Sequence, residues 1–236
     1  METNDLVRDT SLTRKQPDNV EVQLLIGQMY LNKGAFTEAF DMFVVAAQSG
    51  QPQALNMLGR AYEQGWGVTR SVAHAIKYFE SAADQGEGWA CFNLGDLYLA
   101  GDGVEANPQL AFWYYVQAAR SGVNKALNML GTLCESGLAT GQPDKEKARL
   151  YFQAGADAED CWAAFNIGRI CLEEKNDKKA LYWFERSLSY GFPAYWQMLE
   201  VFLSKTRLPL FLKISAKARE LIAGPSGRGK QSILPG

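Results

Sequence analysis

The residue pattern with the clearest chemical meaning is GPSGRGK at Gly224–Lys230, which has the GxxxxGK spacing of a phosphate-binding loop. In such a loop backbone amides and the lysine hold phosphates, and a Ser or Thr directly after the lysine binds magnesium. Gln231 stands at that last position, and the helical pattern KARELIAG precedes the motif where a strand is required. We therefore interpret the segment as a flexible basic tail, and we expect no nucleotide cofactor.

Metal binding and nucleophilic catalysis need several side chains that converge. His74 is the only histidine, and no Cys or carboxylate cluster stands near it at metal-ligand spacing. The four cysteines form neither a CxxC pair nor a disulfide-dense pattern, so we expect reduced, partly buried thiols; they are Cys91, Cys134, Cys161 and Cys171. No constellation supplies a nucleophile, a base and a stabilising group together. The sequence therefore predicts no catalytic residue, no metal site, no cofactor and no small-molecule substrate.

Composition and charge limit the remaining classes of function. The chain has 236 residues, of which 47% are hydrophobic, and its formal net charge of −2 argues against a protein built wholly for nucleic acid. We find no secretory signal pattern and no apolar run near the roughly 18 residues of a membrane span. We therefore expect a cytoplasmic protein without a transmembrane segment. Positive charge gathers after residue 200, where seven Lys and Arg residues accompany one acid, Glu220.

Similar hexapeptides recur along the chain. ALNMLG occurs at Ala54–Gly59 and again at Ala126–Gly131, while ACFNLG and AAFNIG occupy Ala90–Gly95 and Ala163–Gly168. The final glycines of these four segments follow one another at intervals of 36, 36 and 37 residues, and VQLLIG adds an earlier one at Gly27. Periods of this size are typical of solenoid proteins, in which each repeat stacks on its neighbours.

Each repeat has the pattern of a helical hairpin. In the first helix, a small residue, an aliphatic residue, the glycine and a Tyr or Cys lie on one stripe. This marker glycine costs about 1 kcal/mol in a helix relative to Ala, and we expect another helix backbone to pack closely against it. A second amphipathic helix follows a loop, with Ser71, Asn107 and Asp144 predicted as N-caps. Because one hairpin cannot cover its own apolar face, the sequence predicts an all-α solenoid.

The predicted organisation has four parts. Residues 1–19 form a disordered arm, residues 20–191 form five hairpin repeats, residues 192–223 form a capping hairpin, and residues 224–236 form a flexible basic tail. The first and fifth repeats are shorter, because they lack the glycine-containing loops EQGWGV and LAGDGV of the second and third.

Two of these repeats carry a family resemblance. LGRAYEQGWGVTRSVAHAIKYFESAADQG and LGDLYLAGDGVEANPQLAFWYYVQAARSG resemble Sel-one-like repeats, the longer-looped relatives of tetratricopeptide repeats. The resemblance extends over roughly residues 20–191 and implies a right-handed α-solenoid. It also implies an adaptor that binds a protein or peptide, as members do in bacterial signalling, secretion or envelope processes. The cysteines do not recur as in the secreted, cysteine-rich relatives, so a periplasmic location is not carried over.

In tetratricopeptide-like solenoids the first helices line the concave surface, and the resemblance places three positions of each repeat there. They lie three residues before, one after and four after the marker glycine. The first position holds Leu24, Asn56, Phe92, Asn128 and Phe165. The second holds Gln28, Arg60, Asp96, Thr132 and Arg169. The third holds Leu31, Glu63, Leu99, Glu135 and Leu172.

The first and third positions alternate between apolar and polar residues from repeat to repeat, which suits a helix or extended peptide with spaced apolar anchors. A second interpretation stays open, in which Phe92 and Phe165 pack against neighbouring helices as core. Trp66, Trp89 and Trp162 are further candidates for exposed aromatic contacts.

We predict a non-catalytic protein–protein interaction adaptor or scaffold whose concave face binds a protein or peptide. One alternative is a specific inhibitor or immunity-type protein that restrains a partner enzyme. Another is contact with nucleic acid or a membrane surface through the basic C-terminal segment, although this segment lacks aromatic residues interleaved for base stacking. The sequence predicts neither the identity of the partner nor the oligomeric state.

Overall fold

The computed structural model describes residues 19–206 and 209–224. Within these residues the chain forms twelve α-helices and one short 3₁₀ helix, and it forms no strand. Nearly all of the predicted N-terminal arm and basic tail lie outside the described residues, and the proposed four-part division of the chain stays a prediction. The fold class is confirmed as an all-α solenoid.

The helices follow one another as antiparallel pairs joined by short connections. The bounds are α1 (Asn19–Asn32), α2 (Phe36–Ala47), α3 (Pro52–Gln64), α4 (Val72–Ala83), α5 (Gly88–Ala100), α6 (Pro108–Arg120), α7 (Lys125–Ser136), α8 (Lys145–Asp157), α9 (Cys161–Glu173), α10 (Asp177–Tyr190), α11 (Pro193–Thr206) and α12 (Leu212–Ala223). The 3₁₀ helix η1 (Pro209–Phe211) stands between the last two helices.

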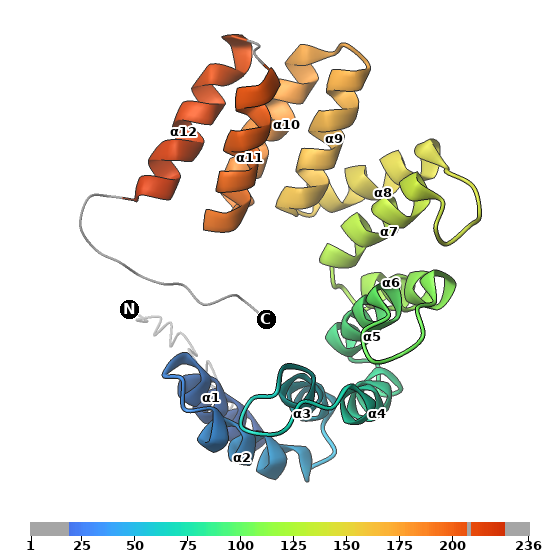
Figure 1. The fold of residues 1–236 in the computed structure, drawn as a ribbon, viewed down its shortest axis with the longest axis vertical. Helices are drawn as coiled ribbons and strands as arrows, with labels where there is room; N and C mark the ends of the chain where they lie inside the picture. The colour runs from blue at the N-terminus through green and yellow to red at the C-terminus, as the bar shows by residue number, and fades with distance from the viewer. Residues whose placement is uncertain (1–18, 207–208, 225–236) are drawn as a thin grey trace, which may run out of the picture.

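The pairs stack along a curved path, so that α1 and α12 come to lie on the same side of the molecule (Figure 1). Each helix packs mainly on the helices next to it in sequence, as expected where every repeat covers its neighbour's apolar face. We refer to the side of this arc that faces its centre as the inner side.

The marker glycines lie inside the first helices because an aromatic ring of the second helix occupies the space of a side chain. A Cβ atom at Gly131 would lie 2.5 Å from ring atoms of Phe152, and one at Gly95 would lie 2.7 Å from the ring of Tyr115. The five rings that contact the marker glycines are fully buried; they are Phe43, Phe79, Tyr115, Phe152 and Phe184. The close neighbour is thus chiefly a ring rather than the expected helix backbone, because the aromatic residue of the second helix reaches across the pair.

The three predicted N-caps are confirmed. The side chains of Ser71, Asn107 and Asp144 accept hydrogen bonds from the backbone amides of the residues three positions later. Asp160 and Asn176 cap α9 and α10 in the same way, at 2.7 Å and 3.2 Å. These caps satisfy amides that have no partner within the helix, and they fix where each helix begins.

The loop glycines place each loop against the preceding repeat. Gly67 has a φ of 67°, and a Cβ atom there would collide with the backbone of Phe36 and Thr37 at the start of α2. Gly103, with a φ of 70°, lies in the same way against Val72 of α4. Glycine therefore serves both the turn and the contact between repeats.

Candidate functional site

A pocket of about 420 Å³ on the inner side brings together four residues of the predicted concave positions and the candidate Trp89. Asn56 and Arg60 on α3 line one wall, and Phe92 and Asp96 on α5 line the other. Lys125, the first residue of α7, closes the pocket from the next repeat. The site therefore spans the second, third and fourth repeats and depends on how they stack.

Helix periodicity directs these side chains into one space. Asn56 and Arg60 are four residues apart on α3, while Trp89, Phe92 and Asp96 follow one stripe of α5. The register of α5 is fixed at its start, where the Glu87 side chain accepts a hydrogen bond from the Trp89 amide at 3.3 Å.

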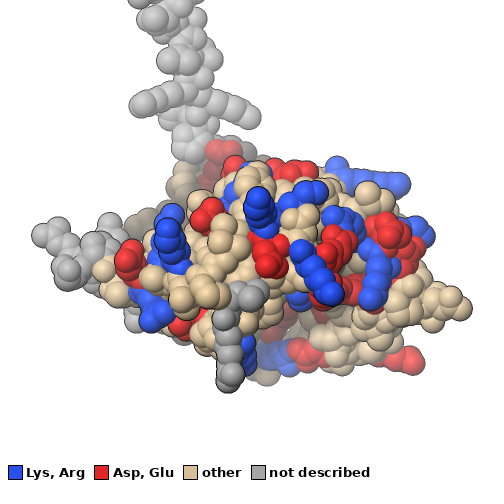
Figure 2. Space-filling view, turned by 90° about the horizontal axis from the view of Figure 1, so that it is seen from above, with Lys and Arg blue, Asp and Glu red and all other residues tan. Residues whose placement is uncertain are grey.

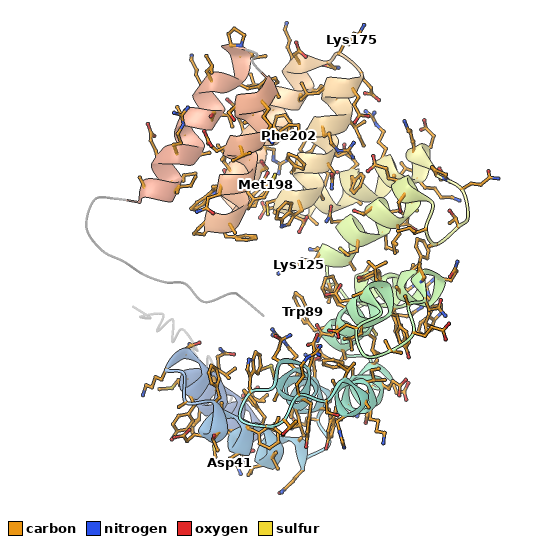
Figure 3. The ribbon with its side chains drawn as sticks, viewed as in Figure 1. Asp41, Trp89, Lys125, Lys175, Met198 and Phe202 are labelled. Carbon is orange, nitrogen blue, oxygen red and sulfur yellow. The ribbon has the colours of Figure 1, made fainter. Side chains whose placement is uncertain are left out.

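Aromatic rings form the apolar wall of the pocket. Trp89 meets Phe92 edge to face with ring centroids 5.7 Å apart, and Phe92 meets the buried Tyr115 at 5.5 Å. The ammonium of Lys125 lies 5.3 Å from the centroid of the Trp89 ring, a cation–π distance. Figure 3 shows Trp89 and Lys125 on neighbouring repeats, with both side chains directed toward the centre of the arc.

A hydrogen bond between two asparagines joins the repeats at the pocket. Nδ2 of Asn93 donates to Oδ1 of Asn56 at 2.9 Å, and Asn56 is only 7% exposed. The same bond recurs two repeats later, where Asn166 donates to Asn128 at 2.9 Å. The polar residue of ALNMLG is therefore one half of a bridge to the following repeat.

Asp96 is the titratable group with the most altered acidity in the pocket. Burial raises the pKa of its carboxyl to about 6, and the neighbouring charge of Glu63 adds to this rise. Tyr115 opposes the rise, since its hydroxyl donates to Oδ1 of Asp96 at 2.6 Å, and Lys125 also lowers the pKa. Burial raises the pKa of Glu63 as well. The negative charge of Glu63 on α3 therefore disfavours the ionised form of Asp96 on α5.

The corresponding positions two repeats later hold a closed ion pair. Arg169 follows its marker glycine as Asp96 does, and its guanidinium contacts both carboxylate oxygens of Glu135 at 2.7 Å. The same guanidinium reaches Glu173 at 2.7 Å. In the later repeats, Arg169 is therefore paired with acidic residues of the protein itself. At the same position of the third repeat, the pocket has the carboxyl group of Asp96.

The other predicted residues lie outside this pocket. Leu24 and Gln28 line a second groove of about 410 Å³ with Met57, between α1 and α3. Thr132 is exposed and donates to the carbonyl of Asn128 on its own helix. Leu31, Leu99 and Leu172 are partly buried against the core.

The two phenylalanines of the alternating series differ in their surroundings. Phe92 lines the pocket, whereas the ring of Phe165 packs between Phe184 and Phe202, with centroids 5.9 Å and 4.9 Å away. Figure 3 places Phe202 on α11, so the following repeat pair covers this position. Phe165 therefore packs against the core, as the alternative interpretation of Phe92 and Phe165 predicts for this residue.

Several lining residues were not singled out from the sequence: Gln53, Met57, Glu87, Asn93 and Lys125. The asparagine had a detectable signal, because Asn stands two residues before the marker glycine in both ACFNLG and AAFNIG. No sequence pattern indicates that Lys125 lines the pocket, because its place there depends on the rotation between successive repeats.

The side chains considered for catalysis or metal binding have structural contacts. His74 is exposed, stacks on Tyr62 at 5.1 Å, and its Nδ1 lies 2.8 Å from Oγ of Ser71. The four cysteines are free and buried. Over the described part of the chain, no group of three His, Cys, Asp or Glu residues is placed to hold a metal ion.

The basic C-terminal segment is described only in part. Arg207, Arg228 and Lys230, with most of the GPSGRGK motif, lie outside the described residues. Arg219 lies 3.3 Å from Glu200. On the face seen from above in Figure 2, basic and acidic side chains are intermixed. Among the helices that the structure describes, none has the length and apolar character needed to cross a membrane.

A curved stack of helical hairpins with an inner pocket defines an α-solenoid of the tetratricopeptide-like type. The Sel1 repeat family model matches residues 52–87, 90–123, 124–160 and 163–189, which together make up more than half of the chain. The protein therefore belongs to the Sel1 repeat family, and the resemblance predicted from the sequence is confirmed.

Solved structures share this fold. A Sel1 repeat protein from Oxalobacter formigenes is 27% identical, with a TM-score of 0.73, and the match covers 88% of this chain and 90% of that one. A protective antigen of uropathogenic Escherichia coli is 26% identical, with a TM-score of 0.65, over 86% of this chain and 46% of that one. An immunity protein from Pseudomonas aeruginosa is 20% identical, with a TM-score of 0.58, over 84% and 81%.

Proposed function

We propose that the protein is a non-catalytic adaptor that binds a protein or peptide segment on the inner side of its arc. The pocket between α3 and α5 is the principal contact, and the observation that carries this proposal is its lining. Trp89 and Phe92 form an apolar wall beside Asn56, Arg60 and Asp96. Aromatic and Arg side chains in a partly enclosed site are the residues that most often dominate binding energy at protein interfaces.

The contrast between repeats supports the choice of this pocket. Arg169 and Glu135 satisfy each other, so the later repeats offer a polar surface already paired within the protein. At the pocket, the equivalent Asp96 has a hydrogen bond from Tyr115 but no Arg as partner at that position. A bound segment adds apolar contact with Trp89 and polar contact with Asp96 in one place. Membership of a family whose repeats commonly mediate protein–protein interaction agrees with this proposal.

The experiment is affinity purification of the tagged full-length chain from its native cells, followed by mass spectrometry. The Trp89→Ala variant should lose the partners that the wild type retains, because it removes the apolar wall at the inner side. Trp113→Ala is the matched control, since this tryptophan is 53% exposed on α6 and lies outside the pocket. Equal partner recovery with both variants would contradict the proposed site.

Restraint of one partner enzyme remains the alternative within protein binding. Immunity proteins from Pseudomonas aeruginosa share the fold at 20% and 16% identity, a level that shows the fold alone. A tight one-to-one complex in which a captured enzyme loses activity would favour this alternative over an adaptor. Recovery of several proteins together, each with its activity intact, would favour the adaptor.

A further inference from the structure

The first helix of the stack exposes an apolar stripe. Val22, Leu25, Ile26 and Met29 of α1 are 37%, 63%, 37% and 56% exposed. Their spacing of i, i+3, i+4 and i+7 places them on one side of the helix. No other helix in the described residues exposes more than two large apolar side chains.

The stripe lies at the end of the described stack, where α1 has no preceding helix among the described residues. The first helices α3, α5, α7 and α9 each pack on the second helix of the preceding repeat as well as on their own. Among the described helices, α1 packs on α2 and α3, and its other side has no partner among them. Terminal repeats of solenoids usually have a polar outer face. Helix α12 exposes Lys213, Lys217 and Glu220, and of its large apolar side chains only Leu212 and Ile222. The α1 end of the described stack therefore exposes more apolar side chains than the α12 end.

The sequences flanking the described residues are poorly suited to cover this stripe. Residues 1–18 contain four large apolar residues, Met1, Leu6, Val7 and Leu12, against seven charged ones, and the apolar positions do not share one helical stripe. Residues 225–236, PSGRGKQSILPG, contain two prolines and three glycines. Neither segment has the paired aromatics and small residues with which α4 and α6 cover their neighbours.

We propose that the exposed stripe of α1 is a homodimer contact, in which α1 of one copy packs antiparallel against α1 of a second. The stripe is symmetric about its midpoint between Leu25 and Ile26, so a two-fold axis there places Val22 of one copy opposite Met29 of the other. Glu21 is the only charged residue in α1, so two copies bring little like charge together. The groove beside Leu25, lined by Leu24, Gln28 and Met57, extends the apolar surface toward α3.

The size of the contact predicts its strength. A 14-residue helix is about 21 Å long, and one helix–helix seam with its flanking groove belongs among the smaller interfaces. The dimer should therefore dissociate on dilution.

Sedimentation velocity of the full-length chain over a wide concentration range tests the proposal. The wild type should change from monomer to dimer as concentration rises, and Leu25→Glu and Met29→Glu should remain monomeric. Leu150→Glu is the matched control, because this leucine is 69% exposed on α8, away from the stripe, and its variant should dimerise as the wild type does. Circular dichroism of each variant checks that the helices are retained.

A cysteine variant gives a second, independent readout. The four native cysteines are free and buried, so Leu25→Cys adds an exposed thiol close to the proposed axis. Oxidation should yield a disulfide-linked dimer of Leu25→Cys and little of Leu150→Cys. A wild type that is monomeric at every concentration, a dimer that persists in both glutamate variants, or equal cross-linking at the two positions would overturn the proposal.

Discussion

At the scale of single residues, the marker glycine and the asparagine beside it explain why the hexapeptides recur. The glycine admits the ring of the second helix, and the asparagine bridges to the next repeat. The sequence predicts a close contact at the marker glycine, but it predicts helix backbone as the partner, and the structure has an aromatic ring there. The Asn93–Asn56 bridge was not inferred, because its partners are 37 residues apart and their distance depends on the turn between repeats.

The contact at the marker glycine predicts that an alanine there lowers the stability of the protein, whereas helix propensity alone predicts a gain. Gly131→Ala should destabilise the protein by about 1–3 kcal/mol through overpacking against Phe152, although Ala is favoured in helices by about 1 kcal/mol. Denaturant unfolding followed by circular dichroism measures this cost. In a Phe152→Leu background the smaller side chain leaves room, so the same change should cost less. A Gly131→Ala variant as stable as the wild type would contradict the contact.

The two asparagine bridges predict unequal costs. Asn93→Ala leaves the amide oxygen of the buried Asn56 without its hydrogen bond, which costs about 1–3 kcal/mol. Asn166→Ala should cost less, because Asn128 is only partly buried and water can replace the lost donor. Denaturant unfolding of the two variants measures both losses of stability. A larger loss for Asn166→Ala than for Asn93→Ala would contradict the deeper burial of Asn56.

The raised pKa of Asp96 predicts that the contribution of this residue to stability falls as pH rises. Its pKa is about 6 in the folded protein and near the ordinary 3.8 in the unfolded chain, so the folded state binds the proton more tightly. The stabilisation of the folded state by protonated Asp96 is complete below about pH 4 and is lost as pH rises through 6. The difference between the two pKa values limits this contribution to about 3 kcal/mol.

The Asp96→Asn variant supplies the test. Its side-chain oxygen can still accept the Tyr115 hydrogen bond but carries no charge. Relative to the wild type, the variant should therefore gain stability between pH 4 and pH 7. Unfolding free energies that change in parallel for the two proteins across this range would exclude Asp96 as the source.

At the scale of elements, helix starts were predictable because capping is local. The place of Ser71, Asn107 and Asp144 before a helical pattern predicts that they are N-caps, and all three accept the expected hydrogen bond. What the sequence did not predict is which inner-side residues end in a pocket and which end in the core. Phe92 and Phe165 hold the same place in their repeats, but Phe202 covers only the second.

The N-cap of α6 predicts a small loss of stability when its side chain is removed. Asn107→Ala removes the 2.9 Å bond to the Leu110 amide and should cost about 1 kcal/mol. Gln109→Ala, at an exposed position two residues further on, is the matched control and should leave stability nearly unchanged. Thermal unfolding of the pair suffices, and equal melting temperatures would show that the cap contributes nothing.

At the scale of the whole molecule, the period of the sequence was enough to predict the solenoid, because each repeat must cover the next. The location of the pocket was not predictable in the same way. It depends on the curvature that directs Trp89 and Lys125 of successive repeats toward the centre of the arc (Figure 3). It also depends on an Asp at the position where a later repeat has Arg169.

Calorimetric titration with the purified partner measures most directly whether a protein binds in the pocket between α3 and α5. Trp89→Ala should weaken binding about tenfold or more, a loss of about 1.4 kcal/mol, while Trp113→Ala should bind as the wild type does. Wild-type affinity for Trp89→Ala, or an equal loss in both variants, would contradict binding in this pocket.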